Sequence, residues 1–236
     1  MAIRDAASEE EPEANKKMVA GYERENRLNF NDNVANYDRY RPDYPVELFE
    51  DIFSYYGPAK NKKALEVGAG TGKASAPFLK AGYDLTAVEI GANMADVLRE
   101  RYKDYSNFEV IVAPFEDVLL KEDNYDLIYA ATAFHWIDAE VGCPKAFRLL
   151  KSGGGFALFR YNNVPADGES YYEEIQELYK KYYHKPYKRP IKVTREGYRT
   201  PTQIYMGFRF EDMRAYGFTD IIMNFYDAER TFDAKE

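Results

Sequence analysis

The sequence predicts an α/β fold in which helices cover both faces of a doubly wound, mainly parallel sheet. Between residues 34 and 161, short apolar runs alternate with helical patterns, which is typical of repeated strand and helix units. A glycine-rich turn, Gly68 to Gly72, directly follows the first apolar run, and an acidic residue, Glu89, ends the second. Sheets of this kind bind ligands beyond the carboxyl ends of their strands, where the strand order reverses.

The individual elements follow from the same patterns. Strands are expected at residues 63–67, 85–89, 108–113, 125–130 and 156–161, with helices ending at residue 80 and spanning residues 93–102 and 144–150. Right-handed crossovers then place the helices on both faces of the sheet.

The chain divides into three zones. Residues 1–33 form a leader that is partly helical, residues 34–161 form the sheet domain, and residues 162–236 form a cap with a helix at 210–216 and a sixth strand at 217–226. The last residues resemble the start of a helix whose remainder is missing. We therefore expect an incomplete C-terminal zone without the final antiparallel edge strand, so that the sheet edge is exposed or covered by a partner.

Composition narrows the classes of function. A formal net charge of −8 would repel a phosphate backbone, so nucleic acid is not expected as a partner. The chain has neither an apolar window long enough to span a bilayer nor a secretory signal, which predicts a cytoplasmic protein without a membrane partner. The single cysteine, Cys143, permits no intramolecular disulfide and no cysteine-based zinc cage, and no metal is expected. We expect a monomer or a homodimer.

The glycine turn lets the backbone approach a ligand closely, because glycine has no Cβ. Lys73 stands where a dinucleotide fingerprint needs its last glycine, and Ala74 follows where a P-loop needs Ser or Thr. Glu89 can accept hydrogen bonds from both ribose hydroxyls. The Phe115 backbone and the Glu116 carboxylate, after the third strand, could lie beside an adenine edge. Together these features predict an adenosine pocket without a pyrophosphate site, although the turn alone could be a tight connection and Glu116 a solvated acid.

These residues resemble the class I S-adenosylmethionine-dependent methyltransferases, whose core is Rossmann-like, from about Val34 to Tyr161. The resemblance is carried by ALEVGAGTG at 64–72, VEI at 88–90 and LKSGGG at 150–155. More narrowly, YDRYRPDYP at 37–45 and AFHWID at 133–138 are similar to the small-molecule branch that includes trans-aconitate methyltransferase-like proteins. The resemblance implies methyl transfer to a small-molecule substrate, with S-adenosyl-L-methionine as cofactor and S-adenosyl-L-homocysteine as product.

The resemblance also implies how the methionyl end of the cofactor is held. Gly68, Ala69 and Gly70 would line the methionyl and ribose parts. Glu66 would help to orient the amino end by hydrogen bonding, and the Ala131 carbonyl would accept a hydrogen bond from the ammonium group.

The adenosine end is assigned in the same way. Glu89 would hold the ribose, while Ile90 and Met94 would sandwich the adenine. Phe115 and Glu116 would read the adenine edge. Taken alone, a methionine such as Met94 is more often a core residue.

The remaining candidate residues would cover the pocket or contact the methyl acceptor. The segment from Tyr37 to Arg41 would fold over the cofactor, with Arg41 either a partner for its carboxylate or a structural arginine. His135 could take a proton from a hydroxyl or amine acceptor, because imidazole titrates near neutrality, whereas with a carboxylate acceptor it would only position the substrate. Trp136 would wall the pocket, and Arg160 could bind an acidic substrate.

The acceptor is further limited by a motif that the sequence lacks. Residues 130–134 read AATAF in place of the Asp/Asn-Pro-Pro-aromatic tetrad of enzymes that methylate the amino nitrogens of bases.

Two alternatives to a small-molecule methyltransferase stay open. One is a non-catalytic regulatory module that binds S-adenosylmethionine, and the other is a nucleotide-dependent oxidoreductase, which the missing glycine disfavours.

Overall fold

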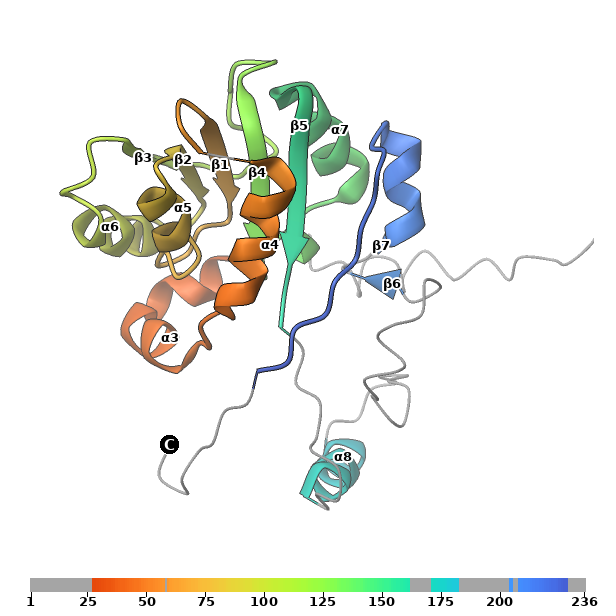
Figure 1. Cartoon of the computed structure of the whole chain (residues 1–236). Coiled ribbons are helices and arrows are strands. Elements are labelled where there is room, and N and C mark those ends of the chain that lie inside the picture. Colours follow the sequence, from red (N-terminus) through yellow and green to blue (C-terminus); the bar gives the residue numbers. More distant parts are fainter. Residues whose placement is uncertain (1–26, 58, 162–170, 183–203, 206–207, 229–236) are drawn as a thin grey trace, which may run out of the picture.

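The computed structural model describes residues 27–57, 59–161, 171–182, 204–205 and 208–228 of the chain. Five strands form one sheet in the order β3-β2-β1-β4-β5, and every pair in it is parallel (Figure 1). The strands are β1 (Lys63–Val67), β2 (Asp84–Glu89), β3 (Phe108–Val112), β4 (Tyr125–Ala131) and β5 (Leu150–Phe159). The predicted doubly wound parallel sheet is confirmed.

Helices cover both faces of this sheet. One face carries α4 (Val46–Tyr56), α5 (Ser75–Ala81) and α6 (Ala92–Arg101), and the other carries α7 (Ala139–Leu149) and the 3₁₀ helix η3 (Phe210–Tyr216). The shorter elements are η1 (Asn29–Asp32), α3 (Val34–Tyr40) and η2 (Phe134–Trp136). Helix α8 (Tyr171–Tyr182) and the antiparallel hairpin of β6 (Ile204–Tyr205) and β7 (Phe208–Arg209) follow the sheet in the chain.

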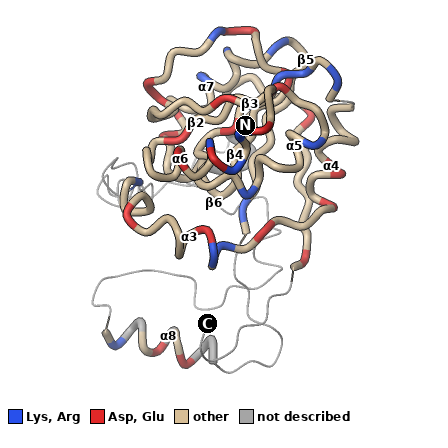
Figure 2. The backbone as a smooth tube through the Cα atoms, turned by 90° about the vertical axis from the view of Figure 1, so that its left-hand side faces the viewer, with Lys and Arg blue, Asp and Glu red and all other residues tan. Residues whose placement is uncertain are grey.

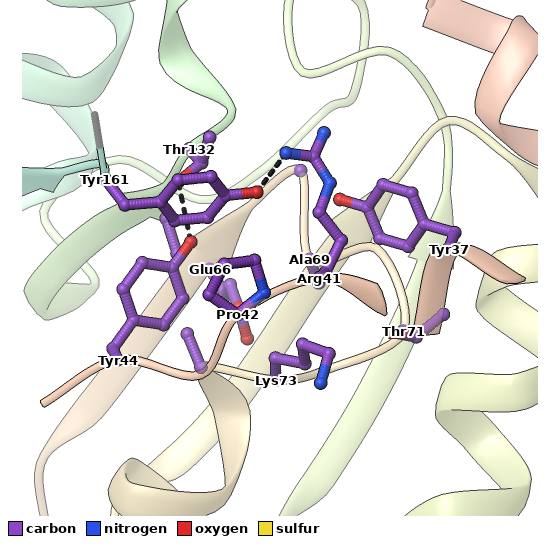
Figure 3. A pocket seen from close by; sticks show the side chains of 13 residues that line it. Tyr37, Arg41, Pro42, Tyr44, Glu66, Ala69, Thr71, Lys73, Thr132 and Tyr161 are labelled. Atoms are coloured by element: carbon purple, nitrogen blue, oxygen red, sulfur yellow. Dashed lines mark hydrogen bonds between the residues drawn. The ribbon is translucent and has the colours of Figure 1, made fainter. Parts of the chain in front are cut away.

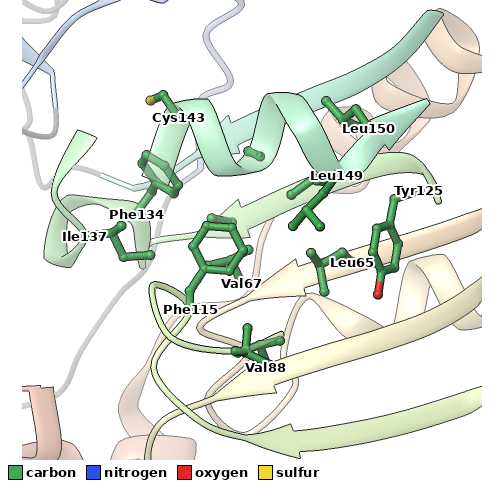
Figure 4. Packing of buried hydrophobic residues seen from close by; sticks show 14 of the residues in the cluster. Leu65, Val67, Val88, Phe115, Tyr125, Phe134, Ile137, Cys143, Leu149 and Leu150 are labelled. Carbon is green, nitrogen blue, oxygen red and sulfur yellow. The ribbon is translucent and has the colours of Figure 1, made fainter. Parts of the chain in front are cut away.

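The two faces of the sheet are both apolar, because successive side chains of a strand point in opposite directions. From β1, Leu65 and Val67 join a buried cluster with Leu149 of α7, which lies over the sheet in Figure 4. Ala64 joins the opposite cluster, where Phe78 of α5 is fully buried. Each of the buried Leu, Val and Phe side chains contributes about 1.5–3 kcal/mol by leaving water, so both helical layers are held firmly to the strands.

The strand order reverses beside β1. The chain passes from β1 to β2 and β3 on one side and then returns to the other side of β1 to form β4. The connections that follow β1 and β4 therefore leave the sheet in opposite directions, and a crevice forms between them at their carboxyl ends.

Helix α7 begins earlier than the sequence analysis predicted, at residue 139 and not at residue 144. The carboxylate of Asp138 accepts a hydrogen bond from the backbone N–H of Glu140 at 2.9 Å, which caps the first turn. Pro144 was expected at the start of the helix but lies inside it. The cap and the buried face of α7 outweigh the hydrogen bond that proline cannot donate.

Strand β5 also begins earlier, at residue 150 and not at residue 156. Leu150 pairs with Tyr125, and a shift of register before Leu127 accommodates the glycine-rich segment. The three consecutive glycines were expected to form a turn that enters the strand. They belong to the strand itself because the irregularity absorbs the extra backbone.

The predicted sixth strand at residues 217–226 is wrong, since no strand occurs in this described segment, and the preceding helix at 210–216 is a 3₁₀ helix. Side chains hold the segment against α4. The Tyr55 hydroxyl donates to the Asp220 carbonyl at 2.9 Å, and the Tyr226 hydroxyl donates to Asp51 Oδ2 at 2.6 Å. A strand needs a backbone ladder with a neighbour, and this segment makes none with β5, which stays an edge of the sheet in the described residues. The predicted cap lies largely outside those residues.

Two glycines with positive φ separate the cost of backbone strain from the cost of crowding. Gly72 (φ 86°) and Gly82 (φ 91°) both have left-handed backbones, so alanine at either position costs about 1–2 kcal/mol. A Cβ at residue 72 would lie 2.4 Å from Leu98 Cδ1 and 2.6 Å from Tyr102 Cε2, whereas nothing lies within 4 Å at residue 82. We predict that Gly72→Ala lowers the free energy of unfolding by about 1–3 kcal/mol more than Gly82→Ala, measured by urea denaturation. Equal losses would contradict this packing.

Candidate functional site

A pocket lies at the switch point, beyond the carboxyl ends of β1 and β4 (Figure 3). It is a partly open pocket with a cavity volume of about 30 Å³. Strand ends, the glycine turn and the chain around α3 supply its lining, which consists of Tyr37, Arg41, Pro42, Tyr44, Glu66, Gly68, Ala69, Thr71, Lys73, Ala74, Ala131, Thr132 and Tyr161. Six of these belong to the predicted cofactor set: Tyr37, Arg41, Glu66, Gly68, Ala69 and Ala131.

The glycine turn closes the pocket from the β1 side. Gly68 (φ 68°) donates its N–H to the Val88 carbonyl at 2.8 Å. A Cβ at residue 68 would lie 2.6 Å from the Cβ of Ala133, in the chain that follows β4. Glycine is therefore required at residue 68 both for the backbone conformation and for the close approach of the two strand ends.

Glu89 joins the turn to the next helix. Its Oε2 accepts a hydrogen bond from the Gly70 N–H at 2.7 Å, and its Oε1 accepts one from the Gly91 N–H at 2.8 Å. Burial raises the pKa of Glu89, and these backbone donors oppose the shift. The structure thus places Gly70 and Glu89 in direct contact beside the pocket, and a carboxylate has further lone pairs for a ligand hydroxyl.

Glu66 lines the pocket and is almost completely buried, at 1% exposure. The Ser75 hydroxyl donates to its Oε2 at 2.5 Å, and the Tyr129 hydroxyl donates to the same oxygen at 2.9 Å. Burial raises the pKa of Glu66 to about 7, the two hydroxyls oppose this shift, and the charge of Glu89 adds to it. The carboxyl group therefore changes its charge close to physiological pH.

Arg41 extends into the pocket from the chain after α3, and Figure 3 shows its guanidinium between Tyr37 and Tyr161. It donates a hydrogen bond to the Tyr161 hydroxyl and lies 4.8 Å from the Tyr37 ring centroid, 5.5 Å from that of Tyr161 and 5.7 Å from that of Phe30. A cation over three aromatic faces is stabilised by their quadrupoles. The aromatic rings therefore fix a positive charge at the mouth of the pocket.

Residues 27–45, called the N-terminal segment below, cover the pocket and are attached to the core by polar contacts along their length. These contacts are Arg27 with Glu116, Asn31 with Asn93, Asp38 with Thr71 and Arg101, Asp43 with Lys73, and Tyr44 with Thr132. The sequence analysis expected only Tyr37 to Arg41 to fold over the site. Contacts between residues so far apart in the chain leave no local signal, so the remainder could not be predicted.

The residues predicted to bind adenine lie beside β2 and β3. Met94 is buried in α6, its Sδ 3.7 Å from where a Cβ of Gly70 would stand, and Ile90 is half-buried after β2. Phe115 is buried in the core cluster. Glu116 accepts two hydrogen bonds from the Arg27 guanidinium, at 2.7 and 3.0 Å, and both side chains are nearly buried. This ion pair gives Glu116 a partner that the sequence did not reveal.

His135 lies in η2, outside the pocket lining, with its ring centroid 5.3 Å from that of Trp136. Its buried Nδ1 has no hydrogen-bond partner among the described residues. Burial, with a smaller contribution from the charges of Arg160 and Arg41, lowers the pKa of His135 to about 4. Its imidazole is therefore neutral at physiological pH, and its surroundings are electropositive. Trp136 packs edge to face on Phe30, with centroids 5.7 Å apart.

Thr132 and Tyr44 are pocket residues that the sequence analysis missed. Thr132 follows β4 with a φ of 53°, and its Oγ1 lies 2.7 Å from the Tyr44 hydroxyl. A positive φ at a threonine is uncommon and often occurs at functional sites. The motif at 37–45 contains Tyr44, but its sequence does not say which part of the core it contacts.

Comparison with known proteins agrees with this geometry. Residues 65–158, from β1 to β5, match a family model described as a methyltransferase domain. The chain is 32% identical over 135 residues to an uncharacterized methyltransferase of Mycobacterium tuberculosis (strain ATCC 25618 / H37Rv), covering 57% of this chain and 53% of that protein. It is 30% identical over 150 residues to malonyl-[acyl-carrier protein] O-methyltransferase 1 of Ilyobacter polytropus, covering 62% and 52%.

Among solved structures, the CcbJ methyltransferase from Streptomyces caelestis is similar, with 25% identity and a TM-score of 0.47 over 56% of this chain and 57% of that chain. The chain spans about half the length of the curated relatives it matches.

Residues 65–158, which span the parallel sheet from β1 to β5, are thus similar in sequence to methyltransferase domains. These sequence matches support the predicted resemblance to the class I S-adenosylmethionine-dependent methyltransferases.

Two other findings concern the described part of the chain. No group of three or more His, Cys, Asp or Glu side chains in it could hold a metal ion. Within the same ranges, no helix combines the length and the apolar character needed to cross a bilayer.

The buried acid predicts a pH-dependent stability difference between the parent and Glu66→Gln in the absence of ligand. The folded-state pKa of about 7 exceeds the ordinary value of 4.5, so protonation stabilises the fold below pH 4.5, and this contribution is lost as the pH rises to about 7. Glutamine stays neutral, so Glu66→Gln gains stability relative to the parent over this interval, by up to about 3 kcal/mol.

Urea denaturation at pH 5, 6, 7 and 8 measures this difference. Glu122→Gln is the matched control. Glu122 is exposed and forms an ion pair with Arg148. It precedes β4 in the chain, so it lies near the amino ends of the strands and not at the carboxyl ends where the pocket lies. The free energy of unfolding of the control should change with pH in the same way as that of the parent. A difference between Glu66→Gln and the parent that does not change with pH would contradict the burial of a titrating carboxyl group.

Proposed function

We propose that the chain is an S-adenosylmethionine-dependent methyltransferase that transfers a methyl group to a carboxylate of a small molecule. The observation that supports it most strongly is the contact between Glu89 and the Gly70 N–H beside the switch-point pocket. A strand-end acid next to a glycine turn suits a ribose without a pyrophosphate, because the acid accepts from both hydroxyls and the turn gives the backbone room.

In this proposal the cofactor lies along the crevice with its methionyl part over the glycine turn. Glu66 and the Ala131 carbonyl accept hydrogen bonds from its ammonium group, since both line the same pocket. Glu89 binds the ribose, and Ile90, Met94 and the chain at Phe115 and Glu116 surround the adenine. A cavity of about 30 Å³ is smaller than a nucleoside, so this proposal requires the N-terminal segment to move outwards when the cofactor binds.

The choice of a carboxylate acceptor rests on charge. His135 is neutral near pH 7, and the charges of Arg41 and Arg160 act on it. An anionic acceptor is attracted to such a region, and a carboxylate needs no base. Methyl transfer from a sulfonium is an in-line displacement, so alignment alone supplies much of the acceleration. The match to an enzyme named for O-methylation of a malonyl group is consistent with this class of acceptor.

A nucleic-acid substrate fits less well. Acidic and basic residues are interspersed along the described part of the chain (Figure 2), whereas proteins that bind a phosphate backbone usually gather Lys and Arg on one face. The chain after β4 also lacks the tetrad that methylation of base amino groups requires. A small acidic molecule therefore remains the favoured acceptor.

The cofactor assignment predicts that the parent binds S-adenosylhomocysteine in a calorimetric titration and that Glu89→Ala weakens this binding. Each hydrogen bond to a charged group contributes about 1.5–3 kcal/mol, so the loss of the ribose contacts should lower the affinity at least about tenfold. Gly70→Val should have a larger effect and abolish binding, because valine is strained at a φ of 58°.

Glu122→Ala is the control for this titration. It removes an exposed acid near the amino ends of the strands, away from the pocket, so its affinity for S-adenosylhomocysteine should equal that of the parent. Circular dichroism checks that each variant is folded. Absence of binding by the folded parent would refute the cofactor assignment, and binding of NADH in its place would favour an oxidoreductase. Binding without turnover over a panel of carboxylic acids would favour a non-catalytic module.

The acceptor class predicts a small effect of His135→Ala. With a carboxylate acceptor, kcat should fall less than about tenfold, because removal of a general base typically costs about 10²–10⁴-fold. The pH profile of the parent between pH 5.5 and 8 should show no inflection from this residue, since burial lowers its pKa to about 4. Mass spectrometric measurement of S-adenosylhomocysteine formation tests both points. A loss above a hundredfold would identify His135 as a base and favour a hydroxyl acceptor.

A further inference from the structure

Glu66, Ser75 and Tyr129 form a buried hydrogen-bonded cluster below the pocket, and all three side chains are at most 1% exposed. The hydroxyls of Ser75 and Tyr129 donate to the same oxygen, Oε2, at 2.5 and 2.9 Å. Among the described residues no donor is recorded for Oε1, and Glu66 lines the cavity. The carboxylate is thus bound from one side and open to a ligand on the other.

Both hydroxyls are held in place by the packing around them. The Tyr129 ring is stacked on Phe78, with centroids 3.9 Å apart and planes at 17°, and on Phe159, with centroids 6.2 Å apart. Ser75 begins α5, and its N–H donates to the Gly72 carbonyl at 3.1 Å. The Tyr129 hydroxyl cannot turn away from Glu66 without disturbing the core, and the Ser75 side chain is fully buried at the start of α5.

We infer that Tyr129 and Ser75 are positioning residues that hold the Glu66 carboxylate ionised, with Oε1 towards the pocket, to bind the ammonium group of S-adenosylmethionine. This inference rests on the proposed function and assigns a role to two side chains that do not touch the ligand. A buried carboxylate is unstable unless it is paired and hydrogen-bonded. Two hydroxyl donors supply the hydrogen bonds from the protein, and the ligand cation supplies the opposite charge.

Other titratable groups also lie near the Glu66 carboxyl group. Glu89, on β2, opposes its ionisation by like charge. Lys73, which enters the same pocket lining, is paired with Asp43, while the buried hydroxyls of Tyr44 and Tyr102 face the carboxyl group from the N-terminal segment and from the end of α6. The variants below leave these groups unchanged, so their effects are common to every protein compared.

The inference makes ligand binding depend on pH in a defined direction. Burial raises the pKa of Glu66 to about 7, and the hydroxyls of Ser75 and Tyr129 oppose that shift. Binding of an ammonium requires the ionised acid, so affinity should rise as the pH increases through about 7. Removing one hydroxyl raises the pKa of Glu66 further, and the rise in affinity should then occur at a higher pH.

Calorimetric titration of S-adenosylhomocysteine at several values between pH 5.5 and 8.5 tests this inference on the full chain. Tyr129→Phe and Ser75→Ala should each move the midpoint of the affinity rise upward by about 0.5–1 pH unit, because one hydrogen bond contributes about 1 kcal/mol. Their affinities should therefore fall several-fold near pH 7 and approach that of the parent at pH 8.5. Titration of the ligand itself is the same in every protein.

Tyr83→Phe is the matched control. Tyr83 is also fully buried and packs on Phe78 in the same cluster, but its hydroxyl has no partner among the described residues. This variant should keep the midpoint of the parent. Glu66→Gln should bind weakly and lose the rise near pH 7.

The outcomes separate the inference from the proposed function. Binding by the parent with an unchanged midpoint in both hydroxyl variants would overturn the inference and leave the cofactor assignment standing. An equal loss of affinity at every pH would show a merely structural role and would also overturn it. Failure of the folded parent to bind would refute both.

Discussion

The carboxylate of Glu89 connects three parts of the fold on which the pocket depends. Glu89 ends β2, and its two oxygens hold the Gly70 N–H in the turn after β1 and the Gly91 N–H at the start of α6. The turn is also bound to β2 through the Gly68 N–H and the Val88 carbonyl. The backbone that would contact the cofactor is therefore fixed by the sheet before any ligand binds, which is the condition for electrostatic preorganisation.

This arrangement requires two acids in a region that would otherwise be apolar. Glu66 and Glu89 lie on neighbouring strands, both are more than 90% buried, and burial raises the pKa of each. Such groups reduce the stability of the free protein, since desolvation of a charge is costly. The aromatic core around Phe78 and Tyr129 offsets this loss and at the same time places the hydroxyl that Glu66 needs. In the proposal, the Tyr129 side chain therefore both stabilises the core and positions the acid that binds the ligand.

The sheet could be predicted from the sequence because its signals are local. Alternating apolar runs located all five strands of the sheet, and the glycine turn and Glu89, which were expected to border one pocket, are joined by a hydrogen bond. The segment at 217–226 has the composition of a strand but is held to α4 by side-chain contacts and pairs with no strand of the sheet, and composition cannot reveal that. The predicted start of α7 is wrong because proline is favoured in the first turn of a helix, whereas Pro144 lies inside this one, after the Asp138 cap.

The site was less predictable where its contacts span the length of the chain. Arg27 and Glu116 are separated by 89 positions, and Tyr44 and Thr132 by 88. No pattern in a short window distinguishes these residues from solvated ones. A glutamate in a loop, a tyrosine in a proline-rich turn and a threonine after a strand are individually ordinary. Their function depends on the tertiary structure that brings them to one crevice.

The ion pair between Arg27 and Glu116 bears directly on how the N-terminal segment and an adenine could share one acid. A carboxylate offers about four acceptor positions, and the bidentate guanidinium of Arg27 uses one on each oxygen. Glu116 can therefore keep Arg27 and still accept a hydrogen bond from an adenine amino group. Closing of the N-terminal segment and binding of the adenosine would then favour each other, since each is completed by the same carboxylate. On this proposal the segment would be part of the binding site as well as its cover.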